Sequence, residues 1–243
     1  MIPLYQLVKE KVFNEFEIMD RETIRWIETS SSHLFPTYNN PPIKLSAKEF
    51  SKIIDFIAKD EWFLTNKIIS SLHGKRHSIR VVINTFLLCK LLKCNPVIFN
   101  SMLISACIHD LRRLNDKKDL DHGRRSAIWY KHNDINSFFH YPHDDDLIFS
   151  TVYLHDISPE IISNRRDCDK YLSSINILKS ADALDRFIQP SDKWWPKEEL
   201  FAIPEAIQLL PHSRLLTLRS ENLALNGVDT VKAVLLAAKE IYG

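Results

Sequence analysis

The sequence predicts an all-α fold, on the evidence of its glycine content and its apolar spacing. Only 4 of the 243 residues are glycine, whereas β-hairpins and phosphate-cradling loops both need glycine where the backbone turns through positive φ. Apolar residues recur at the spacing of a helical stripe, as Ile53, Ile54 and Ile57 do. Ile148 and Val152 repeat that spacing later in the chain. We therefore expect helices throughout.

The N-terminal quarter should hold the first helices. Turn residues and prolines in 30–36 and 38–42 separate the second helix from the third. Ser46, followed three residues later by Glu49, is a capping-box pattern that begins the third helix. The helices expected here span residues 4–16, 20–30, 46–58 and 60–71. Because residues 1–60 carry no chemical motif, we interpret them as an accessory helical segment.

Residues 61–243 should form the core domain, which contains every candidate for chemistry. Gly227 and Asp229 supply a helix stop and a helix cap near its end. The helices expected after residue 71 span 76–93, 96–109, 121–132, 145–156, 167–187, 203–224 and 229–241.

Charge and cysteine usage narrow the class of protein. The 32 basic and 31 acidic residues nearly cancel, so no global field attracts nucleic acid or an anionic membrane. The four cysteines form no Cys-x-x-Cys pair, and we interpret them as reduced, mostly buried thiols. No apolar stretch approaches the roughly 20 residues that span a bilayer, and the N-terminus lacks a secretory pattern. We expect a cytoplasmic protein that does not interact with membranes.

A His-Asp doublet is the most informative feature of the chain. The apolar run 103–108 breaks into His109 and Asp110, two neighbouring side chains that both bind divalent ions. Such a dipeptide is common by chance, and His155 begins a second one. The doublet therefore gains meaning only from other ligands at a suitable spacing.

Further metal-capable residues interrupt the apolar helices. His77 shares a helix face with Arg80, and His122 opens a later helix. A lone histidine on an apolar face is more often hydrogen-bonded in the core than bound to metal. Asp182 is harder to explain, because a buried carboxylate needs a metal or a cationic partner such as Arg186 or Arg80.

Taken in order, the stretches 73–81, 107–110, 121–127 and 178–186 resemble the motifs of the HD-domain superfamily of metal-dependent phosphohydrolases. The resemblance covers about half of the chain and implies an HD-domain-like helical bundle with an N-terminal helical extension. It implies that the primary metal is held by His77, His109, Asp110 and Asp182. It also implies that His122 and His155 hold a second metal or, in its absence, the substrate phosphate.

The expected metal is one or two divalent ions per chain. Imidazole and carboxylate ligands suit manganese, iron, nickel, cobalt or magnesium, and the absence of thiolate ligands argues against a structural zinc. Such an ion would supply an activated water, which we expect Asp110 to position. Many relatives carry an acidic residue where Ser180 stands, and this departure affects the surroundings of the site without removing a ligand.

Several basic residues are candidates for the substrate phosphate. Arg113, beside the doublet, and Lys179, one turn before Asp182, are our candidates for a catalytic contact. Arg80, Arg112, Arg124 and Arg125 are our candidates for substrate binding. Surface ion pairs with Asp116, Asp119 and Asp121 are the alternative for the arginines, and a solvated side chain is the alternative for Lys179.

Other polar and aromatic residues have less specific roles. We interpret His73 as a cap or an outer partner of the site, and Asp185 with Arg186 as a bracing ion pair. The segment holding His132, His140 and His143 is typical of a solvated loop. Trp194 and Trp195 could stack on a base, although tryptophan more often fills a core.

The sequence therefore indicates a metal-dependent phosphohydrolase or phosphodiesterase that acts on a nucleotide or related small phosphoester. One alternative is a nuclease for single-stranded nucleic acid, which the near-neutral charge disfavours because a long polyanion calls for a basic groove. The other is a non-catalytic module that senses nucleotides. The chain could also form a homo-oligomer.

Overall fold

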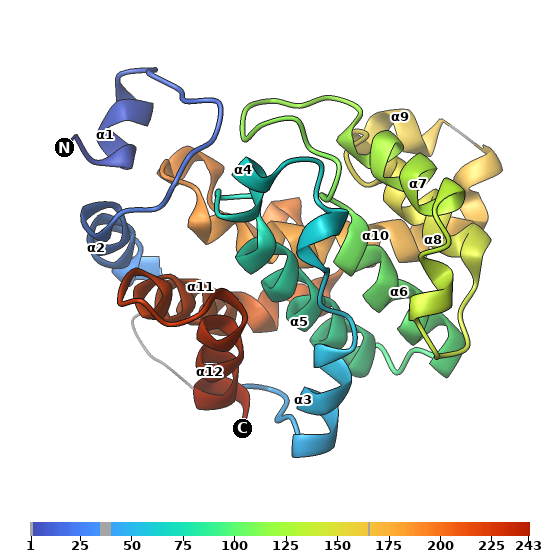
Figure 1. Cartoon of the computed structure of the whole chain (residues 1–243). Helices are drawn as coiled ribbons and strands as arrows, with labels where there is room; N and C mark the ends of the chain where they lie inside the picture. The colour runs from blue at the N-terminus through green and yellow to red at the C-terminus, as the bar shows by residue number, and fades with distance from the viewer. Residues whose placement is uncertain (1, 35–39, 165) are drawn as a thin grey trace.

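The computed structural model describes residues 2–34, 40–164 and 166–243 as helices and connecting segments (Figure 1). These residues contain no β-strand, so the all-α prediction is confirmed for them. The longer helices are α2 (Arg21–Ser30), α5 (Lys75–Leu91), α6 (Pro96–Ile108), α7 (His122–His132), α8 (Asp145–Leu154), α10 (Leu172–Leu184), α11 (Leu210–Leu225) and α12 (Thr230–Tyr242). The shorter ones are α1 (Leu4–Lys9), α3 (Ala47–Ile54), α4 (Asn66–Ile69) and α9 (Pro159–Ser163).

Helix α5 occupies the centre of the molecule and packs against α6, α10, α11 and α12 (Figure 1). Its residues Val82, Leu87 and Cys89 are fully buried, as expected for a helix that is apolar on nearly every face. Helices α7 and α8 pack on each other beyond α6, while α11 and α12 pair on the opposite side of α5. The elements that carry the predicted ligands are therefore neighbours.

Side-chain caps begin several helices where the sequence places them. The capping box of α3 is confirmed, because Ser46 Oγ accepts from the Glu49 N–H while Glu49 Oε2 accepts from the Ser46 N–H. Helices α2, α6, α8 and α12 begin with a simpler cap, in which the side chain of the preceding residue accepts from a backbone N–H of the first turn; these residues are Asp20, Asn95, Asp144 and Asp229.

Some predicted helices are shorter or broken. The one expected at 4–16 ends at Lys9, because Lys11 adopts φ 59° and the Val12 N–H turns back to the Leu7 carbonyl. The one expected at 60–71 divides into a 3₁₀ turn at Asp60–Trp62 and α4, since the Leu64 N–H bonds the distant Leu111 carbonyl. The ones expected at 167–187 and 203–224 likewise contain 3₁₀ segments beside α10 and α11.

The N-terminal segment packs on the rest of the chain. Leu4, Ile24 and Ile53 belong to the same apolar cluster as the buried residues of α5 and α6. Trp195 is almost fully buried and its ring lies 5.4 Å from that of Trp26, so it fills the core. Trp194, by contrast, is 43% exposed. Within the described residues no helix is both long and apolar enough to cross a bilayer.

Candidate metal centre

Five helices direct the six predicted ligands toward a common point, with His109 and the adjacent Asp110 both at the end of α6. His77 stands in the first turn of α5, and His109 follows the last residue of α6. His122 is the first residue of α7, and His155 follows the last residue of α8. Asp182 projects from the last turns of α10. Because all of these residues except Asp182 sit at or beside helix ends, their side chains reach past the packed helix faces that position them.

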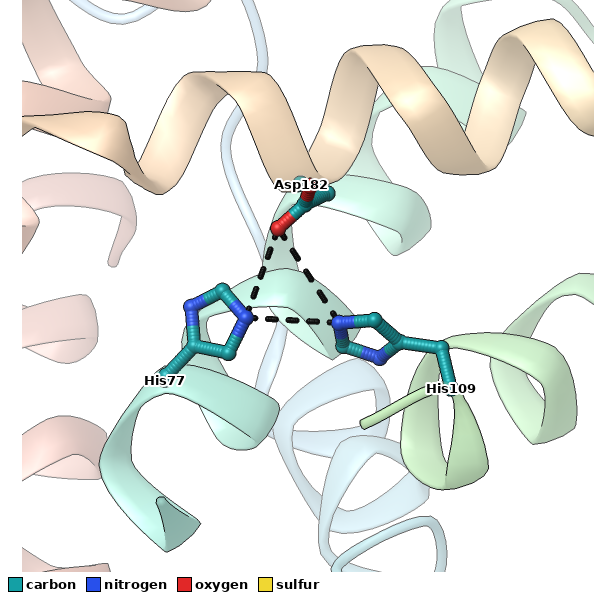
Figure 2. Close-up of side chains that lie close together, drawn as sticks. All are labelled: His77, His109 and Asp182. Atoms are coloured by element: carbon teal, nitrogen blue, oxygen red, sulfur yellow. Dashed lines mark hydrogen bonds and ion pairs between the residues drawn. The ribbon is translucent and has the colours of Figure 1, made fainter. Parts of the chain in front are cut away.

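One part of the cluster is formed by His77, His109 and Asp182, which we call the first side. Figure 2 shows their side chains pointing toward one another from three helices. The Nε2 atoms of His77 and His109 are 3.3 Å apart, and Asp182 Oδ1 lies 3.3 Å from His77 Nε2 and 4.0 Å from His109 Nε2. The three ligand atoms lie within 4.8 Å of one another, so this group could hold a metal ion.

The other part is formed by Asp110, His122 and His155, which we call the second side. Asp110 Oδ1 lies 3.0 Å from His122 Nε2 and 3.7 Å from His155 Nε2. The two imidazole Nε2 atoms are 3.1 Å apart. Asp110 also joins the two sides, since its Oδ2 lies 3.6 Å from His77 Nε2. His109, Asp110 and His155 form a second group that could hold an ion.

Each histidine is fixed through its other ring nitrogen. The Nδ1 atoms of His109, His122 and His155 donate to the carbonyls of Ala106, Asp119 and Val152 at 2.8, 2.7 and 2.7 Å. His77 Nδ1 instead donates to a carboxylate, Asp185 Oδ2, at 2.8 Å. A carbonyl can only accept, so Nδ1 carries a hydrogen, and the ring presents a lone pair at Nε2 once it has lost its Nε2 proton. This is the usual arrangement of metal-binding histidines.

A glycine allows α7 to approach α8 closely. A Cβ atom on Gly123 would lie 2.6 Å from the Val152 carbonyl oxygen and 2.8 Å from His155 Nδ1. No other residue fits that space without moving α8. The close approach is what brings His122 next to His155.

Burial and charge make the cluster suitable for a cation. Burial opposes the charged form of His77, but Asp182 and Asp185 outweigh it and raise its pKa to about 10. Burial lowers the pKa of His109 to about 4. Burial would also raise the pKa of Asp110, yet Arg113 above all holds that pKa well below its usual range. The donor set fits a divalent ion, because facing Nε2 lone pairs and paired carboxylates are stabilised by positive charge between them.

Arg80 is not placed to contact a substrate. It is fully buried, and its guanidinium binds Asp185 through Nε at 2.6 Å and Nη2 at 3.0 Å. A third bond joins Arg80 Nη1 to Glu221 Oε1 at 2.7 Å. The prediction that Arg80 binds substrate is therefore wrong, because its guanidinium is bound to Asp185 and Glu221 inside the protein. Asp185 does brace the site as predicted, but its partners are His77 and Arg80, whereas Arg186 is exposed.

Arg113 lies at the second side. Its Nη1 is 3.5 Å from Asp110 Oδ2 and 3.4 Å from His122 Nε2, and the side chain is 8% exposed. Lys179 is directed elsewhere, because its Nζ donates to the carbonyls of His155 and Ile157 at 2.7 and 2.6 Å. Lys179 thus holds the end of α8, and with it the backbone of His155. Arg113 offers only Nη1 to the cluster, because its Nε and Nη2 donate to the carbonyls of Asn115 and Lys117 at 3.3 and 3.0 Å.

The three remaining arginines are engaged around the connection between α6 and α7. Arg125 pairs with Asp119 at 2.5 Å and donates to the Arg112 carbonyl at 3.0 Å. Arg112 donates to the Trp62 carbonyl and covers an aromatic ring, whereas Arg124 is exposed beside Asp121. These contacts hold the three side chains away from the cluster, so their predicted role in substrate binding gains no support from the geometry.

Two other predictions concern histidines near the cluster. His73 pairs with the buried carboxylate of Asp116 at 2.9 Å, and its ring lies 5.6 Å from that of His77, as expected of an outer partner. His132 and His140 are exposed, in agreement with a solvated segment. Sequence reasoning missed Glu221, and its only signal was an acidic residue in a helix with many apolar positions.

Comparison with protein-family models, with curated proteins and with solved structures gives no match in any of the three. The function of the cluster must therefore be inferred from the distances, burial and charges of its own residues.

Proposed function

We propose that this protein is a metal-dependent phosphoester hydrolase of the HD-domain type. The observation that carries the proposal is the convergence of four imidazole Nε2 atoms on Asp110 and Asp182, with every Nδ1 fixed by an acceptor. His77, His109, Asp110 and Asp182 would hold the primary ion. When bound, a divalent ion such as manganese, iron, nickel, cobalt or magnesium polarises a phosphoryl oxygen and lowers the pKa of a coordinated water.

The chain itself contributes positioning and charge. Asp110 lies between the two sides, where its carboxylate can accept a hydrogen bond from the attacking water and orient it. Arg113, next to Asp110, directs its Nη1 toward the cluster, where it would donate to one phosphate oxygen, because its Nε and Nη2 donate to the carbonyls of Asn115 and Lys117. Asp182 is 30% exposed in its side chain while His77 and His109 are buried, so we infer that substrate enters past Asp182.

The substrate we propose is a nucleotide or a related small phosphoester, handled in the cytoplasm. The near-neutral charge of the chain and the engagement of Arg112 and Arg125 by internal acceptors make a long nucleic acid a weaker candidate. A purely sensing role is also weaker, because the candidate metal ligands expected of a catalytic centre are all present in the cluster. The oligomeric state has no bearing on this proposal.

The test combines metal content with turnover. The purified protein should contain or take up Mn²⁺ and then hydrolyse a generic phosphodiester or a panel of nucleotides. Asp110→Ala should abolish turnover while the helical circular dichroism signal persists, and His140→Ala, which changes an exposed histidine outside the cluster, should change neither. Unchanged turnover in Asp110→Ala would overturn the mechanism. A labelled single strand that is cut faster than any nucleotide would favour the nuclease.

A further inference from the structure

Four charged side chains form a buried series behind His77. Arg76 Nε contacts both carboxylate oxygens of Glu221, at 2.9 and 3.0 Å. Glu221 accepts from Arg80, and Arg80 donates to Asp185 at 2.6 Å. Asp185 in turn accepts from His77 Nδ1 at 2.8 Å. The charges alternate in sign along the series, which begins in α5, passes through α11 and returns to a candidate metal ligand.

The series is almost closed to solvent. Arg80 and Glu221 are 0% exposed and Asp185 is 1% exposed. In such an interior each charge depends on its partner, and removing one leaves the next uncompensated. Without Glu221, the guanidinium of Arg80 would be balanced by Asp185 alone. The carboxylate of Asp185 would then be drawn toward Arg80 and away from His77.

Helix α11 contacts Asp185 and Arg80 at one further point each. Thr217 Oγ1 lies 3.0 Å from Asp185 Oδ1, and Ser220 Oγ accepts from Arg80 Nη1 at 3.2 Å. Thr217, Ser220 and Glu221 are spaced three and four residues apart, so they share one face of the helix. That face contacts Asp185 and Arg80, which lie behind His77, although α11 supplies none of the candidate ligands.

We propose that Glu221 is a positioning residue of the metal centre, acting through Arg80 and Asp185 to fix the orientation of His77. The inference rests on the proposed function. A carboxylate on the second nitrogen of a histidine sets the tautomer, the ring orientation and the basicity of that ligand, and its loss typically weakens metal binding by about 10–100-fold. Glu221 lies two contacts beyond that carboxylate, which here is Asp185, because Arg80 stands between them, so its effect lies at the lower end of that range.

The test measures Mn²⁺ affinity of the full-length protein by titration calorimetry. Glu221→Gln should weaken the tightest binding event by about 10-fold while its stoichiometry and the helical circular dichroism persist. Glu221→Asp, which restores the charge, should recover part of the loss. Arg214→Gln is the matched control, because Arg214 is also buried on α11 but donates to Ser31 and to the Glu28 carbonyl. It should lower the melting temperature and leave the Mn²⁺ affinity unchanged.

Two further variants keep the proposal decidable. In an Asp185→Asn background Glu221→Gln should weaken binding no further, because both act through one carboxylate. Thr217→Val, a nearly isosteric change, should weaken binding about threefold and serves if Glu221→Gln does not fold. Wild-type affinity in both Glu221→Gln and Thr217→Val, or additive losses with Asp185→Asn, would overturn this inference alone. A wild-type protein that binds no Mn²⁺ would overturn the proposed function as well.

Discussion

The two sides of the cluster have similar ligands but different surroundings. On the first side, His77 is supported by the carboxylate of Asp185, and Asp182 adds a second negative charge. On the second side, His122 and His155 are supported through Nδ1 by carbonyls, and the guanidinium of Arg113 stands 3.4 Å from His122 Nε2. The surroundings of the first side are therefore negatively charged, whereas those of the second side include a positive charge.

Because of this difference, we expect the first side and the second side to bind divalent ions with different affinities. A carboxylate behind a histidine raises its basicity and so favours a cation, whereas a nearby guanidinium opposes one. We expect the tighter ion on the first side. The second side should take a weaker ion or the phosphate of the substrate, for which Arg113 is already in place.

The largest effect should come from His109, which belongs to both groups that could hold an ion. His109→Gln removes an Nε2 ligand from each, so we expect metal affinity to fall by more than about 100-fold and turnover to disappear with it. Metal analysis after dialysis and a hydrolysis assay check this. Full metal content in the His109→Gln protein would show that neither side of the cluster holds an ion through His109.

The next effect separates the two sides. His122→Gln and His155→Gln should each eliminate the weaker binding event and leave the tighter one within about threefold of wild type, because Asp185 and Asp182 remain in place. Calorimetric titration with Mn²⁺ counts the events. Loss of the tighter Mn²⁺-binding event in either variant would mean that the two sides form a single binding site.

A smaller effect should follow from the charge of Arg113. Arg113→Met removes a cation 3.5 Å from the buried Asp110, and a unit charge at such a distance is worth about 1 kcal/mol in water and more between buried groups. The weaker ion should therefore bind at least about fivefold more tightly, while KM for the phosphoester rises. Arg124→Met, at an exposed position, is the control. An unchanged KM would exclude Arg113 from substrate binding.

The last effect concerns stability instead of metal binding, at a buried carboxylate that lies outside the cluster. Burial and the nearby Asp116 raise the pKa of Glu17 to about 7, and its Oε1 has no hydrogen-bond partner. Between pH 4.5 and about 7 the unfolded chain loses this proton first, so stability falls as pH rises and the loss is complete above about 7. The loss should be about 1–3 kcal/mol.

Glu17→Gln should remove this fall, which denaturant titrations at pH 5 and pH 8 would detect. Asp185→Asn should behave differently, because Arg80 holds the pKa of Asp185 below its usual value. That variant should be less stable at both pH values. A Glu17→Gln protein with the wild-type pH profile would show that Glu17 is ionised in the fold.

Most of the candidate ligands could be predicted from the sequence because they interrupt an apolar helix or stand at its end. His109 and Asp182 stand where the helical pattern calls for apolar side chains, and a buried polar group needs a partner. The order of the motifs then supplied the rest. Helix boundaries at Lys11 and Leu64 could not be predicted, because they depend on a left-handed residue and on a bond to a distant carbonyl.

The supports of the site were harder to predict than the ligands. Arg80 was assigned to substrate because a sequence shows that a residue is charged but not what it faces. Its partner Glu221 is 141 residues away, and no spacing rule links the two. Lys179 was expected beside Asp182 from helical spacing, yet its long side chain reaches the carbonyls at the end of α8.

Gly123 sets the distance between the start of α7 and the end of α8, and this distance determines how many ions the cluster could hold. A single methyl group at this position would meet the Val152 carbonyl and the ring of His155, and α7 would have to move outward. His122 would leave with it, since it is the first residue of α7. The first side would be untouched, so a chain with alanine here should become a one-ion protein by a change that alters no ligand.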